Sequence, residues 1–348
     1  MHMAKRRSSK RGNKIEPSVM TLSFELSPSS FQNAVTDYID LSQVASLVNR
    51  RFYRQGINWA VAGIKVLNAG GFQGSMVIQK LPNTWVMSNA WEKGFRAWQK
   101  MNREAMEEVA SIRPKFMDFK IFADSDHHAA GVGANLLPVN YAAGLASINT
   151  ATPGEWDYST FEIPLSDANP ANSVTRDVIA VGANYPGPGA SGNFAVSLIE
   201  GYAASRALPD IRDPNMPDDA SDASGSVAEN WQSALFNEGT TQDSEVIQDL
   251  ETQNNQAPYP FENDGIHLDT MYPNGANQLS GLEIHDVEFV TGTTIGGTTR
   301  FKGGNFPCGL IAISNYQTSE GGPFPTIIQI DLIPGNHRGY LCEPMTDM

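Results

Sequence analysis

Residues 20–26, which read MTLSFEL, alternate apolar and polar side chains without exception. A period of two turns every apolar side chain of an extended chain to one face, so this stretch predicts a strand with one buried side. The preceding segment, 4–14, carries six positive charges, no acid and no apolar periodicity. We therefore expect residues 1–17 to form a disordered basic arm and residues 18–348 to form one folded domain that opens with a β-strand.

Further stretches of strand length follow, and turns rich in Gly and Asn, such as Gly303-Gly304, separate them. Only one stretch has a clear helical period, because Trp91, Phe95 and Trp98 fall on one face after the N-cap candidate Asn89. This helix is expected to end before residue 114, and a second short helix is expected over 41–51. The other predicted strands cover residues 57–67, 72–81, 115–123, 159–164, 177–182, 194–199, 282–290, 309–314 and 326–333.

Many short strands and few helices predict an all-β protein with an antiparallel sandwich or closed architecture. The 31 glycines and 21 prolines among 348 residues favour the same turn-rich class. Of the possible forms we expect a jelly roll, with long inserted loops and one or two short helices.

The net charge of -14 conceals two regions of opposite sign. Residues 1–120 hold 18 basic and 9 acidic side chains, whereas residues 121–348 hold 6 basic and 29 acidic ones. Segment 207–280 alone holds 14 acids against one base and shows no strand pattern, so we expect it to form acidic loops at the surface or between subunits.

The basic arm is the first candidate site for nucleic acid. Small polar residues separate its charges, so each side chain can reach a phosphate without fixed geometry. A solubilising tail or a nuclear-import signal are the alternatives. The six candidate residues are Lys5, Arg6, Arg7, Lys10, Arg11 and Lys14.

A second basic cluster follows the short helix expected over 41–51. Arg50, Arg51 and Arg54 surround Phe52 and Tyr53. Cations interleaved with aromatic rings suit phosphate contact together with stacking on unpaired bases. A salt-bridged helix end on the surface is the alternative for this cluster.

Enzyme, cofactor and metal signals are weak. Gly187 to Gly192 matches G-x-G-x-x-G, but residues 184–186 separate it from the strand end and Pro188 removes a backbone donor, so we interpret it as a surface loop. Residues 124–128, Asp-Ser-Asp-His-His, lack a chelating spacing and are expected to be a solvated loop. We found no hydrolase or phosphate-loop motif and no apolar run long enough to cross a bilayer. We therefore expect no enzyme, no cofactor, no metal and no membrane partner.

The order of these features resembles the capsid proteins of circovirus-like, replication-initiator-encoding viruses with circular single-stranded DNA. The resemblance rests on the arm at 4–14, the strand at 20–26, the strands with long loops, and the closing residues 327–340, IIQIDLIPGNHRGY. The arm is shorter and has fewer arginines than in typical circoviruses, which leaves DNA and RNA genomes both open.

The resemblance implies a single viral jelly roll of two packed four-stranded antiparallel sheets. It implies self-assembly of about 60 copies into a small, T=1-like icosahedral shell around single-stranded DNA. It also implies a host receptor bound by surface loops, a location in the virion, and assembly in the host nucleus. The capsid protein of a small RNA virus is the nearer alternative, and a carbohydrate-binding or cupin-like jelly roll is the more distant one.

Overall fold

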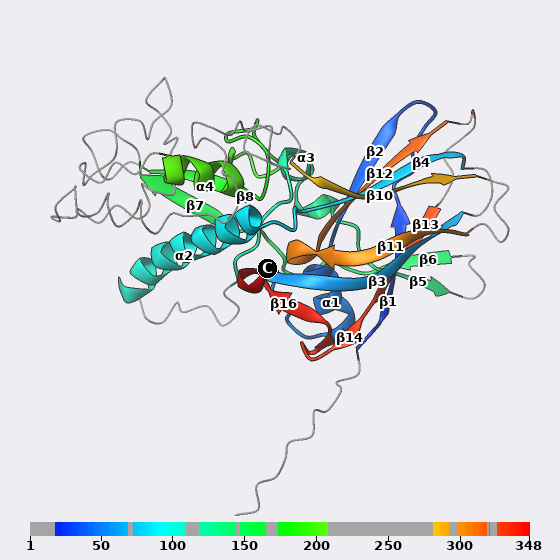
Figure 1. Ribbon diagram of the computed structural model, residues 1–348, viewed down its shortest axis with the longest axis horizontal. Coiled ribbons are helices and arrows are strands. Elements are labelled where there is room, and N and C mark those ends of the chain that lie inside the picture. Colours follow the sequence, from blue (N-terminus) through cyan, green and yellow to red (C-terminus); the bar gives the residue numbers. More distant parts are fainter. Residues whose placement is uncertain are drawn as a thin grey trace, which may run out of the picture.

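The computed structural model describes residues 18–68, 72–108, 118–142, 147–164, 173–207, 281–291, 298–318, 320 and 326–348. Eight strands form two antiparallel sheets that pack face to face (Figure 1). The first sheet has the order β1-β13-β3-β11, and the second has the order β10-β4-β12-β2. The strands are β1 (Thr21–Leu26), β2 (Ala34–Asp40), β3 (Ile57–Asn68), β4 (Gly74–Lys80), β10 (Glu283–Val290), β11 (Thr298–Phe306), β12 (Leu310–Gln317) and β13 (Thr326–Leu332).

The connectivity of these eight strands is that of a jelly roll. Successive strands pass from one sheet to the other, except at β4 and β10, which are neighbours in the same sheet. The expected fold class, an all-β jelly roll of two packed four-stranded sheets, is confirmed. A three-residue strand, β16 (Cys342–Pro344), pairs with β3 and adds to the first sheet.

The strand at 20–26 has the predicted buried side. Leu22, Phe24 and Leu26 are buried, whereas Glu25 between them is exposed. Phe24 pairs in register with Ile328 of β13, which is also fully buried. These side chains belong to the apolar core between the two sheets, which is where the alternation of apolar residues on facing strands must place them.

The two ends of the sandwich differ. The start of β1, helix α1 (Leu41–Asn49) and the turn of 3₁₀-helix Pro307–Gly309 lie at one end, as the strand registers require. The connections β1–β2, β3–β4, β10–β11 and β12–β13 leave from the opposite end. Helix α1 matches the short helix that the sequence predicted.

An insertion joins β4 to β10 at the α1 end. It has its own apolar core, which packs on the outer face of the second sheet through Tyr38, Leu310 and Ala312. Figure 1 shows α2 and α4 beside the sandwich with β7 and β8. Its elements are α2 (Trp85–Glu108), α3 (Ser125–Ala130), β5 (Val139–Ala142), β6 (Ser147–Thr150), β7 (Thr160–Pro164), β8 (Ser173–Ile179), β9 (Ala195–Ser197) and α4 (Leu198–Ala207).

Several expectations change within this insertion. The strands predicted at 159–164, 177–182 and 194–199 correspond to β7, β8 and β9, which form a separate three-stranded sheet and not part of the sandwich. Residues 118–123 contain one isolated bridge at Phe122 in place of the strand predicted at 115–123. Helix α2 is 24 residues long, and α3 and α4 were not predicted. Most of the acidic segment 207–280 lies outside the described residues.

Candidate nucleic-acid interface

The arm joins the folded domain beside the end of α1. The backbone N–H of Val19 donates to Asn49 Oδ1 at 3.0 Å, and Tyr340 Oη donates to the Val19 carbonyl at 2.7 Å. Ser18 Oγ donates to the carbonyl of Arg338 at 2.9 Å and accepts from Arg51 at 3.5 Å. The base of the arm is therefore fixed on the α1 end of the sandwich. The six basic residues of the arm itself, Lys5, Arg6, Arg7, Lys10, Arg11 and Lys14, lie outside the described residues.

The three predicted arginines are grouped in the turn that follows α1. Arg50 caps the helix with a left-handed φ of 52° and is exposed, as is Arg54. Arg54 lies over the ring of Phe52, 5.6 Å from its centroid, and its Nη1 is 4.0 Å from Asp118 Oδ1. Arg51 reaches the base of the arm. The structure therefore brings Arg50, Arg51 and Arg54 together with the site at which the arm leaves the domain.

The expectation for Tyr53 is wrong. Tyr53 is fully buried in the core between the sheets, where its ring lies against Trp59 and Tyr340. Its hydroxyl donates to the Arg338 carbonyl at 3.0 Å. Tyr53 therefore holds the turn in place, and neither face of its ring is accessible to a nucleobase. The half-buried Phe52 points away from this core.

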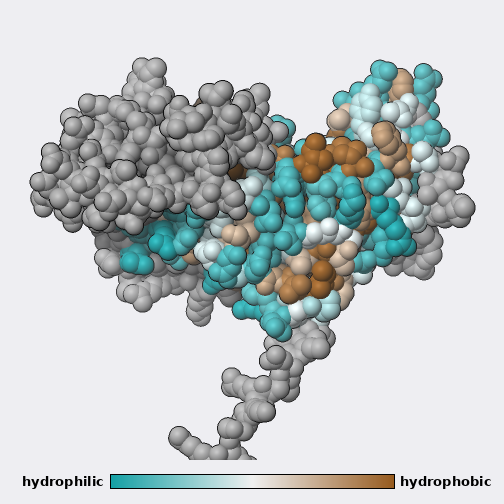
Figure 2. Space-filling model, viewed as in Figure 1, coloured by the Kyte–Doolittle hydropathy of each residue, from teal (hydrophilic) through white to brown (hydrophobic). Residues whose placement is uncertain are grey.

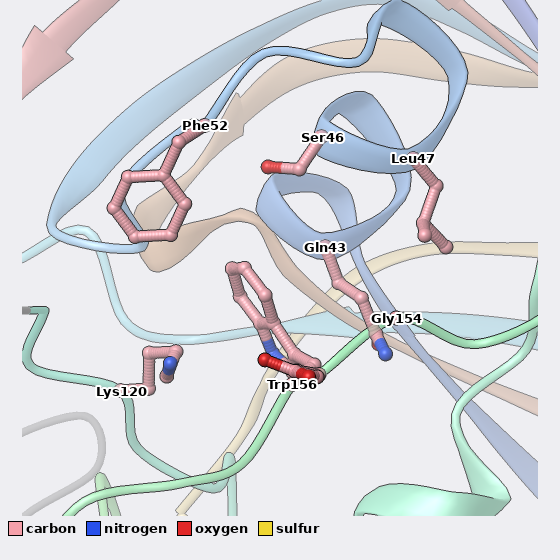
Figure 3. A pocket seen from close by; sticks show the side chains of 8 residues that line it. Gln43, Ser46, Leu47, Phe52, Lys120, Gly154 and Trp156 are labelled. Atoms are coloured by element: carbon pink, nitrogen blue, oxygen red, sulfur yellow. The ribbon is translucent and has the colours of Figure 1, made fainter. Parts of the chain in front are cut away.

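Phe52 lines a pocket of about 320 Å³ beside α1 (Figure 3). Its ring lies 6.3 Å from that of Trp156, and the two ring planes are tilted by 55°. Lys120 Nζ lies 4.7 Å from the centroid of the Trp156 ring, a cation–π distance. The full lining consists of Gln43, Ser46, Leu47, Phe52, Lys120, Gly154, Glu155 and Trp156.

Sequence reasoning missed Gln43, Lys120 and Trp156. Each lies in a different segment, and only the packing of the insertion against α1 brings the three together. A lone Trp in the polar stretch Gly154-Glu155-Trp156-Asp157 was the one local signal, since a large aromatic side chain in a polar loop often has a binding role.

A buried hydrogen-bond chain runs from the insertion to the floor of this pocket. The Ala123 backbone N–H donates to His127 Nδ1 at 3.0 Å, which leaves the proton on Nε2 to be donated to Asn135 Oδ1 at 2.7 Å. Asn135 Nδ2 then donates to Gln43 Oε1 at 3.0 Å. The chain orients the Gln43 amide, so its Nε2 is a donor of fixed direction.

The expected solvated loop at 124–128 is therefore wrong. Asp124 caps the short helix α3 through the His127 backbone N–H, and both histidines are buried. His128 Nε2 bonds to Asp177 Oδ2 at 2.8 Å. Within the described residues, no three His, Cys, Asp or Glu side chains lie close enough to hold a metal ion.

Burial shifts the pKa of several acids and of one base in this junction. Desolvation raises the pKa of Asp40, which caps α1, to about 6, and it raises the pKa of Asp118 to about 6. Desolvation also lowers the pKa of His127 to about 4. His127 is thus neutral at pH 7, in agreement with the bond that its Nδ1 accepts.

We predict that the stability difference between wild type and His127→Gln depends on pH. His127 binds a proton in the unfolded chain near its ordinary pKa of 6.5 but in the folded chain only near 4, so its contribution is lost as the pH falls from 6.5 to 4. The advantage of the wild type should shrink by about 2–3 kcal/mol between pH 7 and pH 4.5, as measured by urea unfolding of both proteins.

The raised pKa values of Asp40 and Asp118 act in the opposite direction, because the folded chain gains protons on them as the pH falls. Their effect is common to both proteins and cancels in the difference. An equal pH dependence for wild type and His127→Gln would show that His127 does not titrate in this way.

Comparisons of the chain with protein families, curated proteins and solved structures found no match. Among the described residues, no helix is both long and apolar enough to span a bilayer. The site is thus defined by its own geometry: a basic turn, the base of a basic arm and an aromatic pocket at one end of a jelly roll.

Proposed function

We propose that this chain is the shell-forming capsid protein of a small virus with a single-stranded genome, of the circovirus-like DNA type. Jelly rolls with basic arms suit this role because the sandwich can tile a shell while the arm reaches the genome. The observation that carries the proposal is the position of Ser18 and Val19, the first described residues after the arm. They contact Arg51 and the end of α1, so the arm would leave the domain beside the arginine turn.

The division of charge along the chain suits a protein whose basic arm contacts a genome while its acidic part does not. The end that carries the arm would face the shell interior, and the acidic remainder of the chain would face outward or toward other subunits. Six arm charges in each of about 60 copies supply on the order of 360 positive charges, which is fewer than the phosphates of a kilobase genome. Arg50, Arg51 and Arg54 would therefore share the neutralisation with the arm, and binding would be independent of base sequence and sensitive to salt.

Self-assembly is supported by an exposed apolar strand. β10 is an edge strand of the second sheet, and Figure 2 shows apolar residues gathered along it. Ile284 is 60% exposed, Val287 45% and Phe289 74%. Large apolar side chains on an edge strand are costly for a monomer but suit a contact with a second copy.

We predict that Phe289→Asp prevents shell assembly without unfolding the subunit. The new charge would have to be desolvated in a subunit contact, whereas in the monomer Phe289 already faces solvent. Phe289→Leu, which keeps an apolar side chain, is the matched control and should assemble. Sedimentation and thermal unfolding report assembly and folding separately. Shells of normal yield from Phe289→Asp would exclude β10 from the subunit contacts.

The direct test of the function is electron microscopy of the purified full-length protein, followed by nuclease treatment of nucleic acid extracted from particles assembled in cells of the natural host. Closed shells with DNase-sensitive single strands are expected. RNase-sensitive strands would instead indicate an RNA virus. A protein that remains monomeric at all salt concentrations would contradict the capsid proposal and favour the alternative, a carbohydrate-binding or cupin-like jelly roll.

A further inference from the structure

We infer that the pocket beside α1 binds one unpaired base of the packaged strand in each subunit. This inference rests on the proposed function and adds to it a specific ligand, a nucleobase, held apart from the phosphate contacts of the arm. It makes the interface selective for single strands, because a paired base cannot leave its partner to enter a pocket without loss of the pair.

The walls of the pocket suit a planar, electron-rich ligand. Phe52 and Trp156 line one cavity from two distant segments, and Lys120 lies against the Trp156 ring (Figure 3). Bases stack on aromatic side chains irrespective of sequence, because every base has a π face. A volume of about 320 Å³ lies at the lower end of the range for small-ligand pockets, which suits a single base and not a base pair.

The polar groups of the pocket match the edge of a base. Gln43 extends from α1 toward Gly154, and among the described residues the structure shows no partner for its Nε2 (Figure 3). This nitrogen can donate to a ring nitrogen or a carbonyl of a base. Glu155 supplies a carboxylate that can accept from an exocyclic amino group. The buried indole N–H of Trp156 also has no partner among the described residues.

The phosphates of the same strand have their own partners near the pocket. Phe52, one wall of the pocket, stands between Arg51 and Arg54 in the chain, and the Arg54 guanidinium lies over the Phe52 ring. A base in the pocket would thus leave its backbone beside the arginine turn. Glu155 is an exposed residue of the lining, so its carboxylate disfavours a phosphate at that edge, whereas the rings of Phe52 and Trp156 suit the base.

The test compares two probes of equal charge on the full-length protein. A 12-nucleotide oligodeoxythymidine and an abasic 12-mer with the same phosphates are titrated by fluorescence anisotropy. Wild type is expected to bind the oligothymidine about tenfold more tightly than the abasic strand, which is the effect of one stacked base. Trp156→Ala should bring this ratio close to one, whereas Trp156→Phe, which keeps an aromatic ring, should retain most of it.

A second measurement does not depend on the affinity of a variant. Photo-cross-linking of a 5-bromodeoxyuridine oligonucleotide to the wild type should modify the peptide that contains Trp156. A preference for the oligothymidine that is unchanged in Trp156→Ala, or a cross-link located elsewhere, would overturn the pocket assignment. If wild type binds both probes equally while shells still contain nucleic acid, the pocket fails and the proposed function stands. If neither probe binds, the proposed function fails as well.

Discussion

Removal of residues 1–17 is expected to give shells that contain almost no nucleic acid. The arm carries six positive charges without an acid over residues 4–14, and binding of single strands through such charges depends on the release of counterions from phosphates. The truncated chain still contains Ser18 and Val19, which bond to Arg338 and to Asn49 at the end of α1. The fold of the domain should therefore be unaffected. The ratio of absorbance at 260 nm to that at 280 nm in purified particles measures the loss.

A matched variant separates charge from length. Replacement of all six basic residues of the arm by Gln keeps the 17-residue segment but removes its positively charged side chains, and it should also give empty shells. Retention of the wild-type absorbance ratio by both variants would contradict a packaging role for the arm. Retention by the Gln variant alone would show that the length of the arm and not its charge carries packaging.

The sandwich could be predicted from sequence where one side of a strand is buried. Residues 20–26 show this most clearly, because Leu22, Phe24 and Leu26 all enter the core. β2 was missed because its sequence, AVTDYID, carries two acids, both of which prove to be buried and hydrogen-bonded. Asp40 caps α1 and Asp37 accepts from the backbone N–H of Ser27, so the burial of both acids depends on hydrogen bonds that an apolar–polar pattern does not report.

β11 was missed for a different reason. Gly303-Gly304 was interpreted as a turn, but both glycines lie within the strand. A Cβ at Gly303 would lie 2.4 Å from the carbonyl oxygens of Val61 and Ala62 on the neighbouring strand β3. The glycine therefore permits a close approach of two backbones, and sequence alone cannot separate that use from a turn.

The candidate site was predicted only in part. Arg50, Arg51 and Arg54 lie within five residues, so the sequence alone shows them as a basic cluster, and they also lie together in the structure. Phe52 and Tyr53 looked equivalent, but adjacent residues in an extended turn face opposite sides, so one lines the pocket and the other enters the core. Three of the four strands predicted within the insertion correspond to β7, β8 and β9, and the one predicted at 115–123 did not form over its described residues, 118–123. A period of two specifies a buried face and not the sheet to which a strand belongs.

Trp59→Ala is expected to reduce the free energy of unfolding by about 3–5 kcal/mol, the usual cost of removing a large aromatic side chain from a core. Trp59 is 1% exposed in β3, and its ring lies 5.3 Å from that of Tyr340. Gly309 packs against the indole so closely that a Cβ there would lie 2.8 Å from the ring. The Gly309 backbone would form one wall of the cavity that Trp59→Ala leaves, and backbone moves less easily than side chains to fill such a cavity. Urea unfolding should show a lower midpoint with an unchanged slope.

The same substitution should weaken binding of single-stranded oligonucleotides. Trp59 Nε1 donates to Ser42 Oγ at 3.2 Å, and Ser42 Oγ in turn donates to the Arg54 carbonyl at 3.1 Å. The indole thus orients a hydroxyl that holds the arginine turn against α1. Trp59→Phe keeps most of the volume but lacks the donor and leaves a small cavity, so it should cost about 1–2 kcal/mol of stability, less than Trp59→Ala. If Trp59→Phe nevertheless weakens oligonucleotide binding, the loss arises from the geometry of the turn. If Trp59→Phe binds oligonucleotides as wild type does, the arginines act through their charge, and the turn does not need the hydrogen bond from Trp59 to Ser42.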